Sequence, residues 1–193
     1  CPLVANPAQG PGGCGARFHD VTYGRDVRGL AVSAQGVVAA TAGGLFEVRP
    51  DVVAGRTSAD GLADNRLDAV FVDAHGRRWA VSDSGVSVSR PDGFVFSMGP
   101  RDAGGGPQGT HFRGVAVDSN DVVYVSSDQG LNVLNAGTWT LLTAPQLPSA
   151  DVRGLWLSPM NEVWAATAAG AARLVNGAVN RTVTGVAGVG DAL

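Results

Sequence analysis

Four charged residues recur at one place in a long repeat of this 193-residue chain, and together they could bind an anion. They are separated by steps of 40, 45 and 40 residues and are Arg28, Asp68, Arg113 and Arg153. Guanidinium groups hydrogen-bond carboxylate and phosphate oxygens in pairs, so clustered arginines would suit an acidic ligand or an acidic partner. The alternative is structural: the arginines pair with nearby carboxylates such as Asp26, Asp68 and Asp151. The residue pattern favours this second interpretation.

Metal and nucleophilic chemistry have little support in the pattern. The three histidines, His19, His75 and His111, are scattered and lack a ligand spacing such as His-x-x-x-His, so we expect no metal site and no cofactor. The chain has no Gly-x-Ser-x-Gly motif and no phosphate loop. Asp73 and Asp118 are expected to cap turns, because a calcium loop needs a denser set of oxygen ligands. We therefore expect a protein that is not an enzyme.

The composition excludes further classes of protein. The net charge is −3 and there is no basic run, so a nucleic-acid partner is not expected. No stretch of about 18 apolar residues is present that could span a membrane. The chain contains no Lys and no Ile, and all 14 basic residues are Arg, which indicates a GC-rich bacterial source.

The four charged residues belong to a phrase that occurs four times, most clearly from Asn65 to Val86. Each copy predicts short strands separated by turns. Inner strands are expected at 26–33, 66–73, 112–118 and 152–158, second strands at 37–41, 77–82, 122–127 and 162–167, and outer strands at 52–57, 94–98, 138–142 and 178–183. Helical periodicity is absent.

A repeat of about 40 to 45 residues with four short strands predicts an all-β fold, a β-propeller of four-stranded antiparallel blades. Its inner strands line a central channel, so the four charged residues would surround one mouth of that channel. The expected domains are an N-terminal Pro/Gly-rich tether at 1–24 and propeller repeats at 25–193, divided into 26–65, 66–110, 111–150 and 151–193.

The repeat resembles the two-component regulator propeller family. The matching residues are Gly61-Leu62, Asp73, Gly76, Trp79, Ser82 and Gly85-Val86, with Ser in place of the family's Thr and Val in place of its Leu. This resemblance implies an extracytoplasmic sensor or binding module. Propellers of this family usually form larger rings.

Aromatic residues divide into two groups. Trp79, Tyr124 and Trp164 share one position of the repeat, which predicts core residues between blades. Trp139 and Trp156 depart from this pattern and are candidates for exposed rings that stack on a sugar or a partner protein.

The N-terminal segment contains both cysteines, Cys1 and Cys14, and the residues between them form a Pro/Gly-rich tether. A chain that begins with Cys and continues into a tether resembles a bacterial lipoprotein, in which Cys1 carries the acyl chains. The alternatives are a disulfide between Cys1 and Cys14, or two unremarkable thiols. The first two interpretations place the protein outside the cytoplasm, in the periplasm or at the cell surface.

Closure of the ring has three alternatives. The chain is part of a longer ring, or its four blades close on themselves with the segment Arg17–Tyr23 as an added outer strand, or a second chain completes the ring. An open array would leave an unpaired blade face.

The sequence therefore predicts a non-catalytic extracytoplasmic propeller that binds or scaffolds a protein partner. A lipid-anchored accessory subunit of a bacterial envelope complex is the concrete form of this prediction. The alternatives are a propeller that senses a saccharide or another small molecule, and a metal-dependent propeller lactonase or lyase.

Overall fold

Sixteen strands form four antiparallel sheets of four strands each in the computed structural model, which describes residues 26–90, 92, 93, 95–100 and 105–185. Each sheet is a blade. Blade 1 contains β1 (Val27–Ser33), β2 (Gly36–Thr41), β3 (Gly44–Val48) and β4 (Val53–Arg56). Blade 2 contains β5 (Ala69–Val72), β6 (Arg78–Ser82), β7 (Gly85–Ser89) and β8 (Val95–Met98). The other two blades are β9 (Phe112–Val117), β10 (Val123–Ser127), β11 (Leu131–Asn135) and β12 (Thr138–Leu142), then β13 (Val152–Leu157), β14 (Val163–Thr167), β15 (Gly170–Val175) and β16 (Ala178–Thr184).

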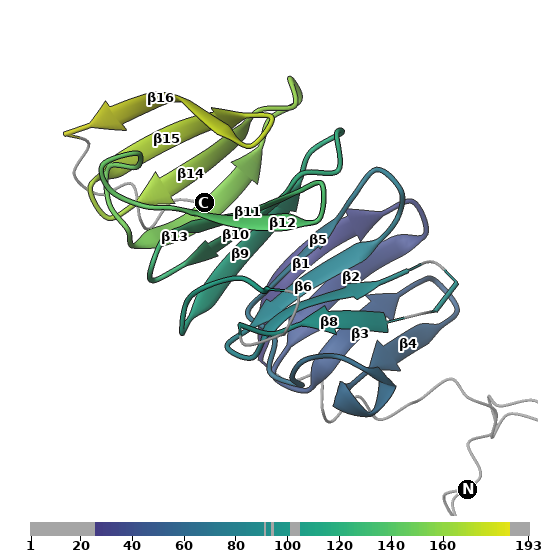
Figure 1. The fold of residues 1–193 in the computed structure, drawn as a ribbon. Coiled ribbons are helices and arrows are strands. Elements are labelled where there is room, and N and C mark those ends of the chain that lie inside the picture. The colour runs from purple at the N-terminus through teal and green to yellow at the C-terminus, as the bar shows by residue number, and fades with distance from the viewer. Residues whose placement is uncertain (1–25, 91, 94, 101–104, 186–193) are drawn as a thin grey trace, which may run out of the picture.

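These blades are the repeats predicted from the sequence, and strand order follows chain order in each. Blades 4 to 1 succeed one another from the upper left to the lower right of Figure 1. The inner strand predicted at 66–73 is shorter, because the amide of Leu67 donates to the carbonyl of Thr41 in blade 1 and not to β6. The only helix in the described residues is a short 3-10 turn at Ser58–Asp60.

The hairpin between β15 and β16 illustrates how the turn residues set strand pairing. Asn176 and Gly177 have φ values of 50° and 80°, a left-handed pair that matches the twist of a two-residue hairpin. Asn and Gly adopt this conformation more easily than other residues. The Asn-Gly pair therefore supports the predicted turn into the outer strand.

The core lies between blades and is divided into three clusters. Trp79 is 5% exposed between blades 2 and 3, and Tyr124 is fully buried between blades 3 and 4. Trp164, the third residue at this position, is half-buried on blade 4. The prediction of core aromatics is confirmed for the first two.

Small residues at the start of the inner strands allow neighbouring blades to approach closely. A Cβ atom added at Gly29 would lie 3.1 Å from the Cα atom of Ala69 and 3.2 Å from the amide nitrogen of Val70. This explains the glycine at this place in blade 1, whereas a Cβ atom added at Gly114 would first meet Ser126 Oγ of its own blade at 3.0 Å.

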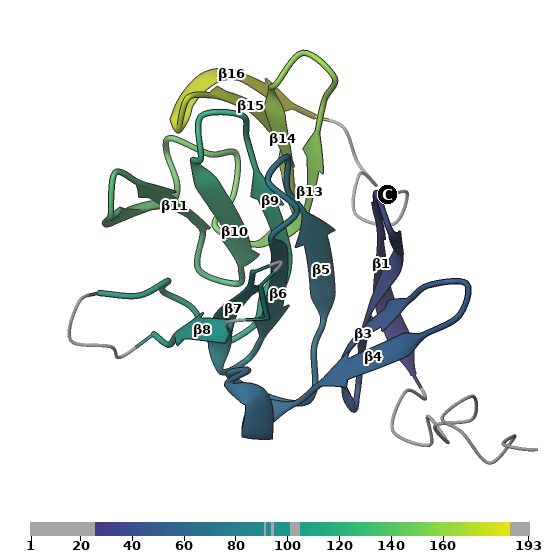
Figure 2. The ribbon, with the colours of Figure 1, turned by 90° about the vertical axis from the view of Figure 1, so that its right-hand side faces the viewer.

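Contacts between inner strands join blade 1 to 2, blade 2 to 3 and blade 3 to 4. No comparable strand contact joins blade 4 to blade 1 in the described part of the chain. In the view of Figure 2, β1 and β5 stand beside each other, as do β9 and β13. The structure thus establishes the blades and their order, and leaves closure of the ring open.

Candidate functional site

The four charged residues that the sequence singled out lie at the start of the innermost strands. Arg28, Arg113 and Arg153 are within β1, β9 and β13, and Asp68 immediately precedes β5. Because these strands are inner neighbours in successive blades, their first residues lie along one mouth of the propeller. Ion pairs connect these residues two by two. Arg28 pairs with Asp68 of the next blade, and Arg113 and Arg153 both pair with Asp151.

The first group joins blades 1 and 2 around Arg28. Its Nη1 donates to Asp68 Oδ1 over 2.6 Å, while its Nε and Nη2 donate to Asp26 Oδ2 over 3.0 and 2.9 Å. The hydrogen bonds to Asp26, and then those to Asp68, raise the pKa of Arg28. Two carboxylates therefore surround one guanidinium, and this part of the mouth carries an excess of negative charge.

The second group joins blades 3 and 4 around Asp151. Arg113 Nη1 donates to Asp151 Oδ1, and Arg153 Nε donates to Asp151 Oδ2 over 3.0 Å. The hydrogen bond from Arg113, supported by that from Arg153, lowers the pKa of the Asp151 carboxyl although burial opposes the shift. Here two guanidiniums share one carboxylate, so this part of the mouth carries an excess of positive charge. The ion pairs with Asp26, Asp68 and Asp151 are those expected from the sequence.

Between these groups, blades 2 and 3 line a shallow depression of about 520 Å³. His111 Nδ1 lies 3.0 Å from Asp83 Oδ1 at its edge, and both side chains are largely exposed. The lining residues are Arg66, Asp68, Asp83, His111, Phe112 and Arg113. The depression is therefore lined by charged side chains of both signs and by Phe112. The ion-pair groups on either side of it differ, with an excess of carboxylates around Arg28 and an excess of guanidiniums around Asp151.

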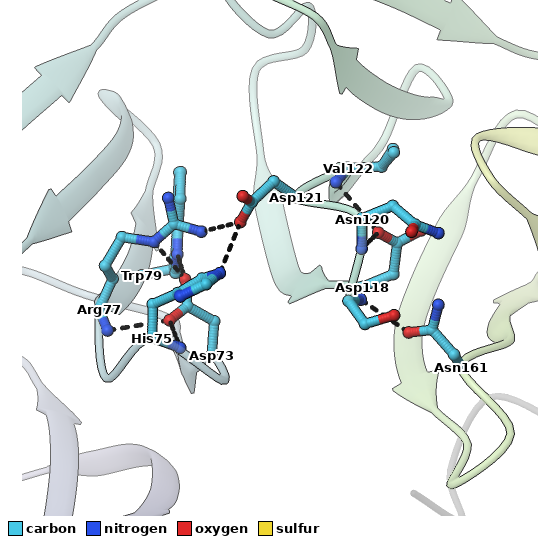
Figure 3. Close-up of polar contacts among 10 residues, drawn as sticks. Asp73, His75, Arg77, Trp79, Asp118, Asn120, Asp121, Val122 and Asn161 are labelled. Carbon is cyan, nitrogen blue, oxygen red and sulfur yellow. Dashed lines mark hydrogen bonds and ion pairs between the residues drawn. The ribbon is translucent and has the colours of Figure 1, made fainter.

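A different polar network occupies the turns after the inner strands (Figure 3). The buried carboxylate of Asp73 accepts hydrogen bonds from the amides of His75 and Arg77, from Arg77 Nε over 2.5 Å and from the indole nitrogen of Trp79 over 2.8 Å. Burial raises the pKa of Asp73, but the bonds from Trp79 and Arg77 outweigh it and lower the pKa. Asp73 therefore caps its turn, as predicted, and also fixes the aromatic ring of the core.

Blade 3 repeats this arrangement with Asp118. Its Oδ1 accepts from the amides of Asn120 and Val122, and its Oδ2 accepts from the hydroxyl of Tyr124 over 2.9 Å. The same hydroxyl accepts a bond of 2.7 Å from the amide of Gly177 in blade 4. The predicted turn cap is confirmed, and through Tyr124 it also reaches the next blade.

Two further contacts connect the turns of neighbouring blades. Arg77 Nη2 donates to Asp121 Oδ1 of blade 3, and the amide of Ser119 donates to Asn161 Oδ1 of blade 4 over 2.7 Å (Figure 3). Sequence reasoning did not identify these links. The sequence shows Arg77 two residues before Trp79, but its partner Asp121 lies 44 residues further along the chain, so the contact has no local pattern.

The aromatic candidates differ in exposure. Trp156 is 48% exposed on β13, whereas Trp139 is half-buried against the core between blades 2 and 3. Trp156 thus offers more of its ring to a partner. Binding by either residue stays a prediction.

The remaining candidates are separated or lie outside the described residues. His75 follows β5 and His111 precedes β9, so they are at opposite ends of adjacent inner strands. Cys1, Cys14 and His19 are outside the described residues. Within the described part of the chain, no group of three or more His, Cys, Asp or Glu side chains is placed to hold a metal ion, and no helix is long and apolar enough to cross a membrane.

Comparison with known proteins identifies the fold. The extracellular domain of the putative hybrid two component system BT4673 from B. thetaiotaomicron is 14% identical, with a TM-score of 0.63 over 82% of this chain and 22% of that chain. Catalytically inactive virginiamycin B lyase from Staphylococcus aureus, solved with quinupristin, is 12% identical, with a TM-score of 0.67 over 86% of this chain and 57% of that one. The gluconolactonase XC5397 from Xanthomonas campestris is 15% identical, with a TM-score of 0.57 over 82% and 62%.

These similarities confirm the β-propeller prediction at the level of the fold. The chain spans less than two thirds of the length of each of these proteins. No protein-family model matches the chain, and no curated protein matches it. The resemblance to two-component regulator propellers is therefore supported as a fold shared with extracellular domains of putative two-component systems, and no family membership is shown.

Proposed function

We propose that this chain is a non-catalytic propeller module that binds an acidic surface of a protein partner outside the cytoplasm. The observation that carries the proposal is the shared carboxylate of Asp151, which faces both Arg113 and Arg153. The two arginine side chains remain 38% and 46% exposed. A carboxylate from a partner could therefore supply the missing counter-charge without breaking the existing ion pairs.

A peptide array rich in Asp and Glu tests this function with the wild-type chain and an Arg113→Ala/Arg153→Ala variant. We expect the double variant to bind acidic peptides roughly tenfold more weakly, because two charge-assisted hydrogen bonds are lost. Arg181→Ala is the matched control, since it removes an exposed arginine from the outer strand β16. A folded double variant with unchanged affinity would contradict the proposal.

The proposed location is the bacterial envelope, with Cys1 acylated and residues 1–24 acting as the tether. The fold shared with extracellular domains of putative two-component systems supports an extracytoplasmic site. The intact mass of the native protein, isolated with its lipids, tests the anchor. A mass increase from acyl chains on Cys1 is expected, whereas loss of the two thiol hydrogens of Cys1 and Cys14 would indicate the disulfide instead.

A second candidate function is catalysis or ligand sensing in the channel. It is favoured by the fold shared with virginiamycin B lyase and a gluconolactonase. In this case Asp68, Asp83 and His111 around the depression are the groups that would contact the ligand. Metal analysis with a lactone-hydrolysis assay tests the enzyme, and a glycan array tests the saccharide sensor.

A further inference from the structure

A small cavity of about 80 Å³ lies between the outer parts of blades 1 and 2, and four charged side chains line it. Blade 1 contributes Glu47, Arg49 and Arg56 from β3, β4 and the turn between them, and blade 2 contributes Arg78 and Ser89 from β6 and β7. Arg78 and Ser89 lie directly opposite each other in the strand pairing, so their side chains share the face toward blade 1. The cavity is therefore built where two blade faces meet, and it shares no lining residue with the charged mouth.

The repeat has apolar residues at these positions in the other two interfaces between blades. Each of the cavity residues Glu47, Arg56, Arg78 and Ser89 has a fixed place in the strand pairing, so its equivalents can be identified. Between blades 2 and 3 the equivalents are Val88, Met98, Val123 and Leu134, and between blades 3 and 4 they are Val133, Leu142, Val163 and Leu174. All of these residues pack in the core clusters. The interface of blades 1 and 2 therefore has charged and hydroxyl groups in place of an apolar layer, and such departures from a consistent pattern are expected at functional sites.

Glu47 is the one carboxylate among the described residues that line the cavity, and its oxygens are fully engaged. Both accept from Arg78 Nη2 over 2.8 Å, and Oε1 also accepts from Arg49 Nε over 3.1 Å. Burial raises the pKa of Glu47, but the hydrogen bonds from Arg78 and then from Arg49 outweigh it and lower the pKa. Glu47 therefore stays ionised and holds two guanidiniums beside the same cavity.

Several guanidinium donors at the cavity are not used by Glu47. Arg78 is 7% exposed, and its buried Nε has no hydrogen-bond partner among the residues that the structure describes. The side chain of Arg56 likewise forms no ion pair or hydrogen bond within the described part of the chain. A Cβ atom added at Gly93 would lie 3.3 Å from Arg56 Nη2, so this guanidinium reaches across to the turn between β7 and β8. Three guanidiniums and one carboxylate give the lining a formal charge of +2.

We propose that this cavity binds a phosphate group, either as the free ion or as the end group of a small ester. Arginine forks match phosphate oxygens in charge and geometry, and a doubly charged anion would balance the lining. A water-sized probe occupies roughly 10 to 15 Å³, so the volume suits a phosphate ion and is well below the roughly 300 Å³ of a pocket for a larger ligand. The phosphate oxygens would accept from Arg56 and from the buried Nε of Arg78. This inference does not depend on the acidic partner proposed above.

Isothermal titration calorimetry of the full chain with inorganic phosphate, in a chloride buffer, tests the site. We expect saturable binding that is at least about tenfold weaker in Arg56→Gln, because charge-assisted hydrogen bonds are lost while the Arg78–Glu47 ion pair remains. Arg181→Gln is the matched control, since it removes the same charge from the exposed side of the outer strand β16. No saturable binding of phosphate, or equal weakening in both variants, would overturn the proposal.

Arg78→Lys tests the buried Nε of Arg78. The substitution keeps the positive charge but replaces the planar fork with a single ammonium group. Phosphate that binds the folded chain raises the melting temperature, and each variant is compared with itself without phosphate, so a less stable fold does not obscure the result. We expect the rise seen in wild type to be lost or reduced severalfold in Arg78→Lys. An equal rise would contradict the proposed contact with this nitrogen.

Competition experiments identify the chemical class of the anion and its source. Sulfate should displace phosphate, whereas acetate at the same concentration should not, because acetate has a single charge and too few oxygens to reach all three guanidiniums. Equal displacement by acetate would contradict a site for a tetrahedral ion. Glycerol phosphate distinguishes the two sources that the proposal includes. If it displaces inorganic phosphate, the cavity binds the end group of an ester, and if it does not, the cavity binds the free ion.

Discussion

The hydroxyl of Tyr124 connects blade 3 to blade 4, and Tyr124→Phe removes it alone. It donates to Asp118 Oδ2 over 2.9 Å and accepts from the amide of Gly177 over 2.7 Å. The Tyr124 ring is fully buried, so a phenylalanine ring would keep the same packing. The substitution therefore isolates two hydrogen bonds from the hydrophobic contribution.

The expected loss of unfolding free energy is about 2 to 4 kcal/mol. A hydrogen bond to a charged group contributes roughly 1.5 to 3 kcal/mol, and the amide left without its acceptor adds about 1 kcal/mol. The Gly177 amide is only partly buried, so water can compensate some of its loss. For a chain of this length, such a change lowers the melting temperature by roughly 5 to 15 °C.

Equilibrium denaturation of wild type, Tyr124→Phe, Asp118→Asn and the double variant measures both the loss and its coupling. We expect the double variant to lose less free energy than the sum of the two single losses. Hydrogen exchange at the Gly177 amide should accelerate in Tyr124→Phe. A loss below about 1 kcal/mol with additive effects would refute the reasoning, because it would be in the range of an ordinary surface substitution.

Alkaline pH provides a second measurement of the same contact. Burial raises the pKa of Tyr124, and the bond to Asp118 raises it further. Because the folded-state pKa lies above the unfolded value, the contribution of this hydroxyl is complete below about pH 10 and is lost as the pH rises above it. Tyr124→Phe should therefore remove part of the alkaline loss of stability seen in wild type.

Three other predictions follow from single contacts. Burial raises the pKa of Asp128, but hydrogen bonds from Thr110 and His111 lower it to about 2. The contribution of these bonds to the unfolding free energy is therefore present above about pH 4 and is lost as the pH falls toward 2. Acid titrations of Asp128→Asn should lack this loss. Gly29→Val should lower the unfolding free energy by about 1 to 3 kcal/mol in denaturant titrations, because its Cβ would meet the backbone of blade 2, and an unchanged value would contradict the close approach. Arg78→Ala should cost about 2 kcal/mol by thermal unfolding, because it removes the hydrogen bonds of Arg78 to Glu47 across the blade 1–2 interface and leaves Glu47 with Arg49 alone. A loss equal to that of Arg49→Ala would argue against this.

The architecture could be predicted because each blade is specified by local signals. Asn176-Gly177 marks a hairpin, and small residues such as Gly29 mark the close approach of inner strands. Both signals act over a few residues, so they can be recognised without knowing how the blades are oriented. For this reason the strand positions agree closely with the structure.

The links between blades could not be predicted in the same way. The Arg77–Asp121 contact depends on the rotation of one blade relative to the next, which no local pattern records. The charged mouth was predicted in part, because Arg28, Arg113 and Arg153 share a repeat position. The opposite charge balance at its two ends depends on Asp26 and Asp151, whose sharing between blades appears only in three dimensions.

Among the described residues, a bond between an acidic turn and an aromatic residue is present in blades 2 and 3 and not in blades 1 and 4. Blades 2 and 3 have it as Asp73–Trp79 and Asp118–Tyr124. In blade 4 Ser158 takes the acidic position, and its hydroxyl accepts only from the amides of Met160 and Glu162. Amide protection should therefore be lower in the turn of blade 4 than in the turns of blades 2 and 3, because the blade 4 turn can open without breaking such a bond.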